Sequence, residues 1–358
     1  MPMQRLIDSR QILHILTLFL IVQFAGILVA FMNYSTIPVA ELTNTQIASS
    51  PIDILAYIGW IVLFAIFLVI FSKIYKGKWG YVIIEGFAIA VASFFVFLSI
   101  LGYFFPNADA NLLLAISLFL GISLVAAKNK MPNLRNTAAV LSGIGIGVIL
   151  GISFSFGAAM LFMLFIAFYD YIAVFVTKHM ITLANAVSSR NLAFLVGSSE
   201  VRAVNKSSLE GTNKKELKEY IGKVKKIDNP IMKKVIEQGM VPIVSQIQLG
   251  GGDLGIPLVV AVSAYQLQFN YFFSVVCIIG ATAGLVATMY FLKRFERPLP
   301  AIPPLFSGIS VAVGIAFLAT GYSDLESSVA LIVLGLSITL LGMYLTLRSG
   351  ERNAKKTA

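Results

Sequence analysis

The sequence predicts an all-α polytopic membrane protein with about ten transmembrane helices. Of its 358 residues, 58% are hydrophobic and 12% are charged, whereas about 25% of the residues of a soluble domain are charged. The apolar runs have the length of about 20 residues that a helix needs to cross a bilayer core of about 30 Å. They lack the alternation over about 10 residues that is typical of a membrane barrel. The remaining solution is a helical bundle in lipid, in which each helix satisfies its own backbone groups.

Ten apolar runs follow one another along the chain. The first is expected to stay in the membrane, because no small-residue cleavage site of a signal peptide follows it. The only long polar region is residues 178–240. The predicted spans cover residues 11–33, 52–72, 81–105, 110–127, 137–155, 157–177, 251–269, 271–292, 301–320 and 327–347. They divide the chain into an N-terminal five-helix part (1–155), a single span (156–177), a long loop (178–240), a second transmembrane part (241–320) and a last helix with its tail (321–358).

The basic residues predict which side of the membrane each loop faces. When the loops are assigned alternately to the two sides, all 27 Lys and Arg residues fall on the same side. The positive-inside rule therefore places both ends and the long loop in the cytoplasm. Within that loop, Asn213 and Glu216 resemble a capping box, and Pro230 suits the start of a second helix. The basic loop is expected to rest on anionic lipid headgroups.

Several function classes are excluded by what the sequence contains. The net charge of +10 is explained by the sorting of basic loops to one side, so the bilayer and not a nucleic acid is the expected partner. The single cysteine, Cys277, excludes an intramolecular disulfide and a cysteine-based metal cluster. An HExxH motif is missing, and His14 and His179 are the only histidines. We therefore expect no metal and no cofactor, while a homo-oligomer stays open.

Three acidic residues lie inside apolar segments. A carboxylate near the bilayer centre costs several kcal/mol, so such residues by default mark function. Of the 17 acidic residues, only Glu85, Asp170 and Asp253 are of this kind. Asp170 precedes Lys178 by eight residues, which places it roughly 12 Å from the cytoplasmic end of its span at 1.5 Å per residue. Asp253 enters the membrane from the same side, so the two aspartates are expected to meet at similar depth.

Two carboxylates held together in a site of low dielectric constant cannot both ionise, so they share a proton. This is the chemistry of an aspartic protease, in which the ionised group activates a water and the protonated group donates to the developing oxyanion. The glycines at 250–252 fit this chemistry, because a substrate backbone can approach closely where side chains are missing. The extended-looking segment Ile243–Leu249 is suited to pair with an unwound substrate as an added strand.

Three short motifs around the aspartates carry a family resemblance. Residues 167–170 read AFYD and precede Ala173-Val174, residues 250–253 read GGGD, and residues 300–303 read PAIP. In this order, and in spans six, seven and nine, they resemble the YD, GxGD and PALP motifs of the presenilin and signal peptide peptidase family of intramembrane aspartyl proteases. The chain looks like a prokaryotic presenilin homologue. The resemblance implies cleavage of transmembrane helices by Asp170 and Asp253, with supporting roles for Tyr169, Gly250, Gly252, Pro300, Ala301, Ile302 and Pro303.

The chain departs from the family pattern at two points. Ile302 stands where the family has Leu, which conserves volume. The tenth span is either an addition or a misjudged segment, because the family usually ends after nine spans with its C-terminus outside. Family members with a cytoplasmic N-terminus resemble presenilin and take substrate helices whose N-terminus is outside.

Other interpretations stay open. A proton-coupled transporter or ion-leak pathway would use the two aspartates as ion sites, a prepilin-peptidase-like enzyme would cut a cytoplasmic leader, and a scaffold would need neither acid. Glu85 lies one to two turns from Lys76 and Lys78, which favours an interfacial ion pair over catalysis. The glycines between Gly143 and Gly151 are typical of a close helix-packing face.

Overall fold

The computed structural model describes most of the chain, and its helices follow the predicted spans. It describes residues 9–36, 79–131, 134–176, 195–205, 240–268, 270–295 and 299–357, with a few helical residues between 52 and 63. Within this part, eight helices are long and apolar enough to cross a membrane. The predicted second span, residues 52–72, lies almost wholly outside the described residues and stays a prediction.

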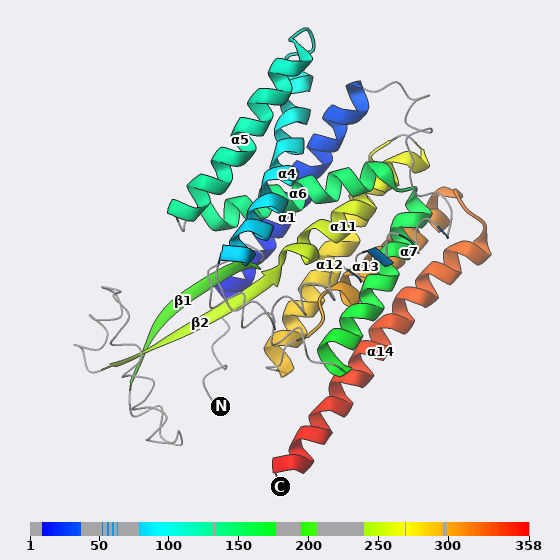
Figure 1. Cartoon of the computed structure of the whole chain (residues 1–358). Helices are drawn as coiled ribbons and strands as arrows, with labels where there is room; N and C mark the ends of the chain where they lie inside the picture. Colours follow the sequence, from blue (N-terminus) through cyan, green and yellow to red (C-terminus); the bar gives the residue numbers. More distant parts are fainter. Residues whose placement is uncertain are drawn as a thin grey trace.

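Nine α-helices occupy the described residues (Figure 1): α1 (Ser9–Thr36), α4 (Trp79–Phe104), α5 (Ala110–Lys130), α6 (Leu134–Ser153), α7 (Phe156–Tyr171), α11 (Gly251–Ser263), α12 (Phe272–Phe295), α13 (Ile302–Thr320) and α14 (Leu325–Thr357). A π-helical turn, Ile172–Val176, continues α7, and a 3-10 turn, Ala264–Leu267, continues α11. The helix α11 has 13 residues and is the shortest of these nine helices. The predicted helical membrane fold is confirmed, and α14, which covers the predicted tenth span, is long and apolar enough to cross a membrane.

Local sequence explains several of the helix ends. The carboxylate of Asp109 accepts the N–H groups of Asn111 and Leu112 at 2.7 and 3.3 Å, which caps α5. The hydroxyl of Ser155 accepts the N–H of Ala158 at 3.3 Å, which caps α7. At the other end of a helix, Gly321 terminates α13 with a φ of 63°, a left-handed conformation that glycine adopts without steric cost.

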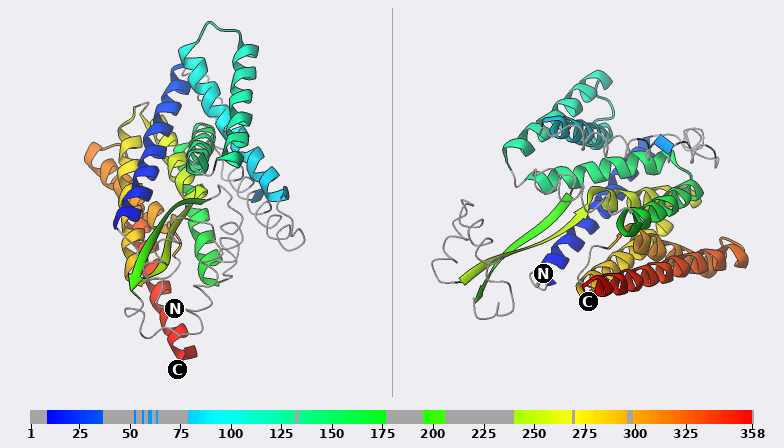
Figure 2. Two further views of the ribbon diagram at one scale, coloured as in Figure 1. Left: turned by 90° about the vertical axis from the view of Figure 1, so that its left-hand side faces the viewer. Right: turned by 60° about the horizontal axis from the view of Figure 1, so that its bottom comes forward.

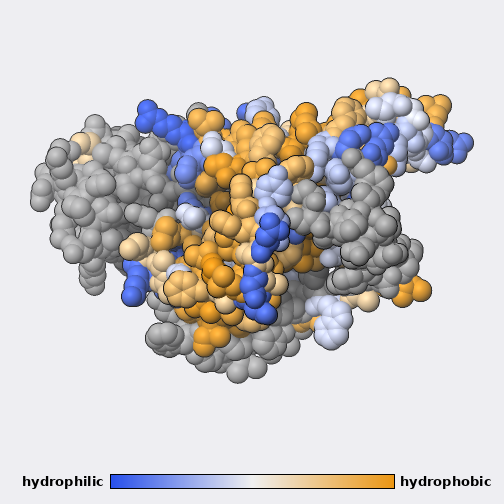
Figure 3. Space-filling model, turned by 90° about the horizontal axis from the view of Figure 1, so that it is seen from above, coloured by the Kyte–Doolittle hydropathy of each residue, from blue (hydrophilic) through white to orange (hydrophobic). Residues whose placement is uncertain are grey.

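The helices form one bundle with α11 at its centre (Figure 2). Around α11 lie α6, α1, α12 and α7, while α13 packs between α12 and α14. The outermost helices are α5 and α14, whose spans are 11% and 17% buried, compared with 61% for α13. Large apolar side chains are exposed on the described surface, among them Phe87 (72%), Phe119 (70%) and Leu340 (66%), and Figure 3 shows how apolar residues spread over one face. Such a surface fits a lipid environment.

Close approach of α6 to its neighbours depends on glycine, as the sequence predicts. A methyl group at Gly147 would meet Leu258 of α11 at 2.7 Å, and one at Gly151 would meet Val262 of α11 at 2.6 Å. A methyl group at Gly145 would collide with the backbone carbonyl of Ala92 in α4. The glycine face therefore lets α6 lie directly against the central helix and against α4.

Two strands depart from the all-α prediction. Strand β1 (Leu195–Asn205) pairs antiparallel with β2 (Met240–Gly250), from Leu195 opposite Gly250 to Asn205 opposite Met240. The extended character of 243–249 is predicted by the sequence, whereas β1 falls in the segment expected to be a loop. The sequence gives no sign of β1 because a strand is stabilised by pairing with its partner, and here the paired residues are 35 to 55 positions apart in the chain. The helices predicted to start at Asn213 and Pro230 lie outside the described residues.

The hairpin, the start of α1 and the end of α14 lie toward the same side of the bundle. In Figure 1 this is the lower side, where α1 contacts both strands and the red end of α14 emerges. The turn between α4 and α5, residues 105–109, lies at the top of the same view. This arrangement agrees with an even number of membrane crossings between the two ends.

Candidate active site

The first candidate aspartate lies near the end of α7. Asp170 is the penultimate residue of this helix, and its side chain is buried with 9% of its surface exposed. Directly after it the helix widens into the π-helical turn Ile172–Val176, where the N–H of Ile172 faces the carbonyls of both Phe168 and Tyr169. Such widened turns often occur at functional sites, because they redirect a side chain without breaking the helix.

The second candidate aspartate begins the central helix. Strand β2 ends at Gly250, and α11 starts at the next residue, so Asp253 stands in the first turn. Its Oδ2 accepts the N–H of Gly250 at 3.2 Å, which fixes the carboxylate beside the end of the strand. A methyl group at Gly250 would lie 3.1 Å from that oxygen. A side chain at 250 would therefore crowd the carboxylate of Asp253 where it turns back onto the strand end.

The structure brings the two carboxylates together, as the sequence predicts. Helices α7 and α11 contact each other, and Asp170 lies close enough to Asp253 for their charges to repel when both groups ionise. In the described part of the chain, no Lys or Arg forms a salt bridge with either acid. Two uncompensated negative charges in lipid would be costly, so one shared proton is the favourable state.

The PAIP segment supplies backbone donors to Asp170. The N–H of Ile302 donates to Asp170 Oδ2 at 3.3 Å, and the N–H of Ala301 also faces this carboxylate. Pro300, Pro303 and Pro304 have no N–H, so Ala301 and Ile302 are the only amide donors of the segment 300–304. These donors stand at the N-terminus of α13, where helix amides lack internal partners and attract negative charge.

Two tyrosines flank Asp170, and only one of them is singled out by sequence reasoning. Tyr169, the expected supporting residue, is partly buried and close enough to Asp170 for an electrostatic interaction. No sequence pattern singles out Tyr171. Its side chain is 5% exposed, and its hydroxyl donates to the carbonyl oxygen of Ile338 in α14 at 2.7 Å. Its position beside the aspartate is the sole signal in the sequence.

The third intramembrane acid belongs to a separate feature. Glu85 of α4 forms a salt bridge of 2.7 Å with Lys128 of α5, and both side chains are buried. An ion pair is expected from the sequence, but the partner differs: Lys76 and Lys78 lie outside the described residues, and the partner observed comes from another helix. Sequence proximity favours the lysines before α4, whereas packing of α5 on α4 decides which lysine reaches the acid.

A cavity opens beside the glycines that precede Asp253. Its volume is about 150 Å³, and its lining includes Gly251, Gly252 and Ile256 of α11, Ser142 and Ile146 of α6, and Glu85. A methyl group at Gly252 would meet nothing nearer than Ile256 at 3.7 Å. The first turn of α11 therefore faces open space on the side of this cavity. Among the described residues, no group of three or more His, Cys, Asp or Glu could hold a metal ion.

Comparisons with known proteins identify the family of this chain. A model of a protein family matches residues 16–322, which is most of the chain. The description of this family is "Signal-peptide peptidase, presenilin aspartyl protease". No curated protein sequence matches.

Two solved structures of a presenilin family intramembrane aspartate protease share the fold. The structure in space group C222 is 19% identical in sequence, with a TM-score of 0.52, and the match covers 85% of this chain and 95% of that chain. The structure in space group P2 is 21% identical in sequence, with a TM-score of 0.54, and the match covers 85% of this chain and 97% of that chain. The chain belongs to the family of signal-peptide peptidases and presenilin aspartyl proteases, and it is an intramembrane aspartyl protease.

Proposed function

We propose that this protease hydrolyses peptide bonds within transmembrane helices by means of Asp170 and Asp253. The observation that carries the proposal is the meeting of two acids from α7 and α11 in the membrane, with no basic partner among the described residues. Each carboxylate is held by a backbone amide, that of Ile302 or that of Gly250. The ionised partner takes a proton from a water as it attacks the peptide carbonyl, and the protonated partner donates to the oxyanion.

The hairpin supports a mode of substrate binding. A peptide bond in an intact helix is shielded by its hydrogen bonds, so the helix must unwind locally before cleavage. In the described part of the chain the sheet has the order β1–β2, so β2 pairs with β1 along one edge only. An unwound substrate can add to the other edge as a strand. Because β2 leads directly into α11, that strand would run beside Asp253 and the cavity at Gly251 and Gly252.

The remaining motif residues receive supporting roles in this proposal. Gly250 and Gly252 keep the path of the substrate backbone free of side chains. The prolines at 300 and 303 confine the amide donors of the PAIP segment to Ala301 and Ile302, which aim at Asp170. Tyr169 lines the same approach to Asp170 from the preceding position of α7.

Purified protein in liposomes is expected to cleave a transmembrane peptide whose cytoplasmic third contains helix-breaking residues. The same peptide with leucines in place of those residues should be cut more slowly, because unwinding costs more. Product masses identify the cut, and Asp253→Ala is the inactive control. Proton flux through these liposomes, without peptide products and sensitive to both aspartates, would instead support the transporter alternative.

We also propose that the protein lies in the cell membrane with its N-terminus and hairpin in the cytoplasm. The connections expected outside, 105–109 and 321–324, contain no Lys or Arg, whereas Lys128, Lys130 and Arg135 lie around the connection of α5 to α6. The bilayer and its anionic headgroups are then the partner of the basic loops. With this orientation, the substrate helix is expected to run with its N-terminus outside.

Cysteine labelling tests this orientation. In a Cys277→Ala background, Ser323→Cys should react with an impermeant reagent in intact cells, because residue 323 lies in the outer turn. Asn129→Cys and Thr357→Cys should react only after the membrane is permeabilised. Labelling of Asn129→Cys in intact cells would invert the topology. Labelling of Thr357→Cys in intact cells, with Asn129→Cys still protected, would place the tail outside and remove the tenth crossing.

A further inference from the structure

The last helix stands outside the part of the chain that the family shares. The family match ends at residue 322, and α14 begins at Leu325. Nevertheless, α14 packs along α13, the helix that starts with the PAIP segment. The hydroxyl of Ser307 in α13 donates to the carbonyl oxygen of Gly335 in α14 at 2.6 Å and also contacts the hydroxyl of Thr339. The added helix is thus bonded to α13 about one turn after the PAIP segment.

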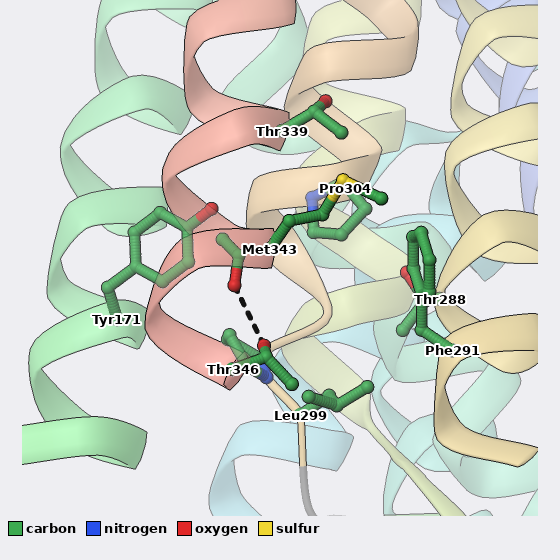
Figure 4. A pocket seen from close by; sticks show the side chains of 10 residues that line it. Tyr171, Thr288, Phe291, Leu299, Pro304, Thr339, Met343 and Thr346 are labelled. Carbon is green, nitrogen blue, oxygen red and sulfur yellow. Dashed lines mark hydrogen bonds between the residues drawn. The ribbon is translucent and has the colours of Figure 1, made fainter. Parts of the chain in front are cut away.

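The same helix also holds α7. The hydroxyl of Tyr171 donates to the carbonyl oxygen of Ile338 at 2.7 Å, and both residues are buried, at 5% and 4% exposure. A methyl group at Gly342 would lie 2.5 Å from that hydroxyl. Glycine at 342 therefore makes room for the tyrosine, one turn beyond the carbonyl that it binds. Figure 4 shows Tyr171 reaching from α7 toward α14 at this level.

These two attachments join the elements whose relative position determines the geometry of Asp170. The carboxylate of Asp170 on α7 accepts the N–H of Ile302 at the start of α13, so a shift between α7 and α13 stretches this bond. Tyr171 follows Asp170 directly and ties α7 to α14, while Ser307 ties α13 to α14. The added helix therefore bridges the acid and its backbone donor.

The packing around the hydroxyl of Tyr171 is incomplete. A cavity of about 40 Å³ lies where α7, α12, α14 and the PAIP segment meet. Its lining includes Tyr171, Pro300, Pro304, Thr339, Gly342 and Thr346 (Figure 4). The side chains around this space have fewer packing partners than they would have in a filled core. A directional hydrogen bond is then more important for their alignment than it would be in a filled core.

We infer that Tyr171 is a positioning residue for cleavage, which binds α14 and thereby holds Asp170 in register with the amide of Ile302. This inference rests on the proposed role of Asp170. The added helix α14 then has a function in catalysis, because it binds both α7 and α13 and keeps them in a fixed relative position. Tyr171 acts through Asp170 and makes no contact with the peptide bond that is cut.

The test compares kcat and KM for a transmembrane peptide in liposomes. Tyr171→Phe keeps the ring and removes the hydroxyl, so kcat should fall about tenfold while KM stays within about twofold, because misalignment affects the reacting group and not peptide binding. Gly342→Ala should lower kcat similarly by pushing on the hydroxyl. The matched controls are Tyr290→Phe, an exposed tyrosine on α12, and Gly102→Ala, where an added methyl group meets nothing within 4 Å. Rates are divided by the amount of folded protein from size-exclusion chromatography.

The double variant separates positioning from general damage. In Tyr171→Phe with Gly342→Ala, the hydroxyl that the added methyl group would strike is gone, so kcat should be no lower than in Tyr171→Phe alone. Independent effects would multiply to about a hundredfold loss. Such multiplication, a kcat for Tyr171→Phe equal to that of Tyr290→Phe, or a change confined to KM would each overturn the inference while leaving the proposed function intact. Wild-type protein without cleavage would overturn the proposed function itself.

Discussion

Replacing either Asp170 or Asp253 with Asn is expected to lower kcat by about 10⁴-fold, because the dyad needs one carboxylate to take a proton and the other to donate one. Asparagine conserves the size of the side chain but can perform neither step as a carboxyl group does. The two residues act as a unit, so the double variant should be no slower than either single variant. Initial rates of product formation, measured by mass spectrometry over a long incubation, provide the necessary range.

An exposed acid provides the matched control for this experiment. Asp324 lies in the turn between α13 and α14, exposed and remote from the PAIP segment at the other end of α13. Asp324→Asn removes the same charge, and kcat should remain within about twofold of the wild type. A single dyad variant that retains more than a few per cent of wild-type activity would exclude a two-aspartate mechanism.

Removing one member of the buried pair Glu85–Lys128 is expected to lower the free energy of unfolding by about 3–5 kcal/mol. The pair joins α4 to α5 at 2.7 Å with both side chains buried, so Glu85→Gln or Lys128→Met alone leaves an uncompensated charge in the membrane. The double variant should recover most of the loss, because no buried charge then remains. To rank the variants by stability, each is heated in detergent, and the protein that stays soluble is measured at each temperature.

A neighbouring lysine is the control for this pair. Lys130 lies two residues further along α5 with an exposed side chain, so Lys130→Met should change the unfolding temperature little. Equal losses for Lys128→Met and Lys130→Met would mean that charge at this end of α5, and not the ion pair, determines stability. A double variant less stable than both singles would likewise contradict the account.

The helices and the aspartates can be predicted because the bilayer imposes strict requirements on the sequence. A span must be apolar and about 20 residues long, so α14 is as visible as α1 although the family usually lacks it. Acids inside such spans are costly, which reduces 17 acidic residues to three candidates. The spacing of the YD-like and GxGD motifs then assigns two of these acids to the sixth and seventh spans, which correspond to α7 and α11.

Features that depend on contacts between distant segments cannot be predicted in the same way. Strand β1 has no distinct composition, and only its register with β2 identifies it. The partner of Glu85 depends on how α5 packs against α4 and not on distance along the chain. Tyr171 acquires its role from a carbonyl 167 residues away, which no local pattern of an apolar helix reveals.

The central claim is that Asp170 and Asp253 together add water to a peptide bond of a transmembrane helix. The most direct measurement incubates purified protein in liposomes with a transmembrane peptide in water enriched in oxygen-18. For the wild type, we expect two fragments whose masses sum to the peptide plus one water, with a single heavy oxygen incorporated at the new carboxyl group. Asp170→Asn and Asp253→Asn should yield no such fragments. An intact peptide with the wild type, or labelled fragments in equal yield from the variant lacking both aspartates, would contradict the claim.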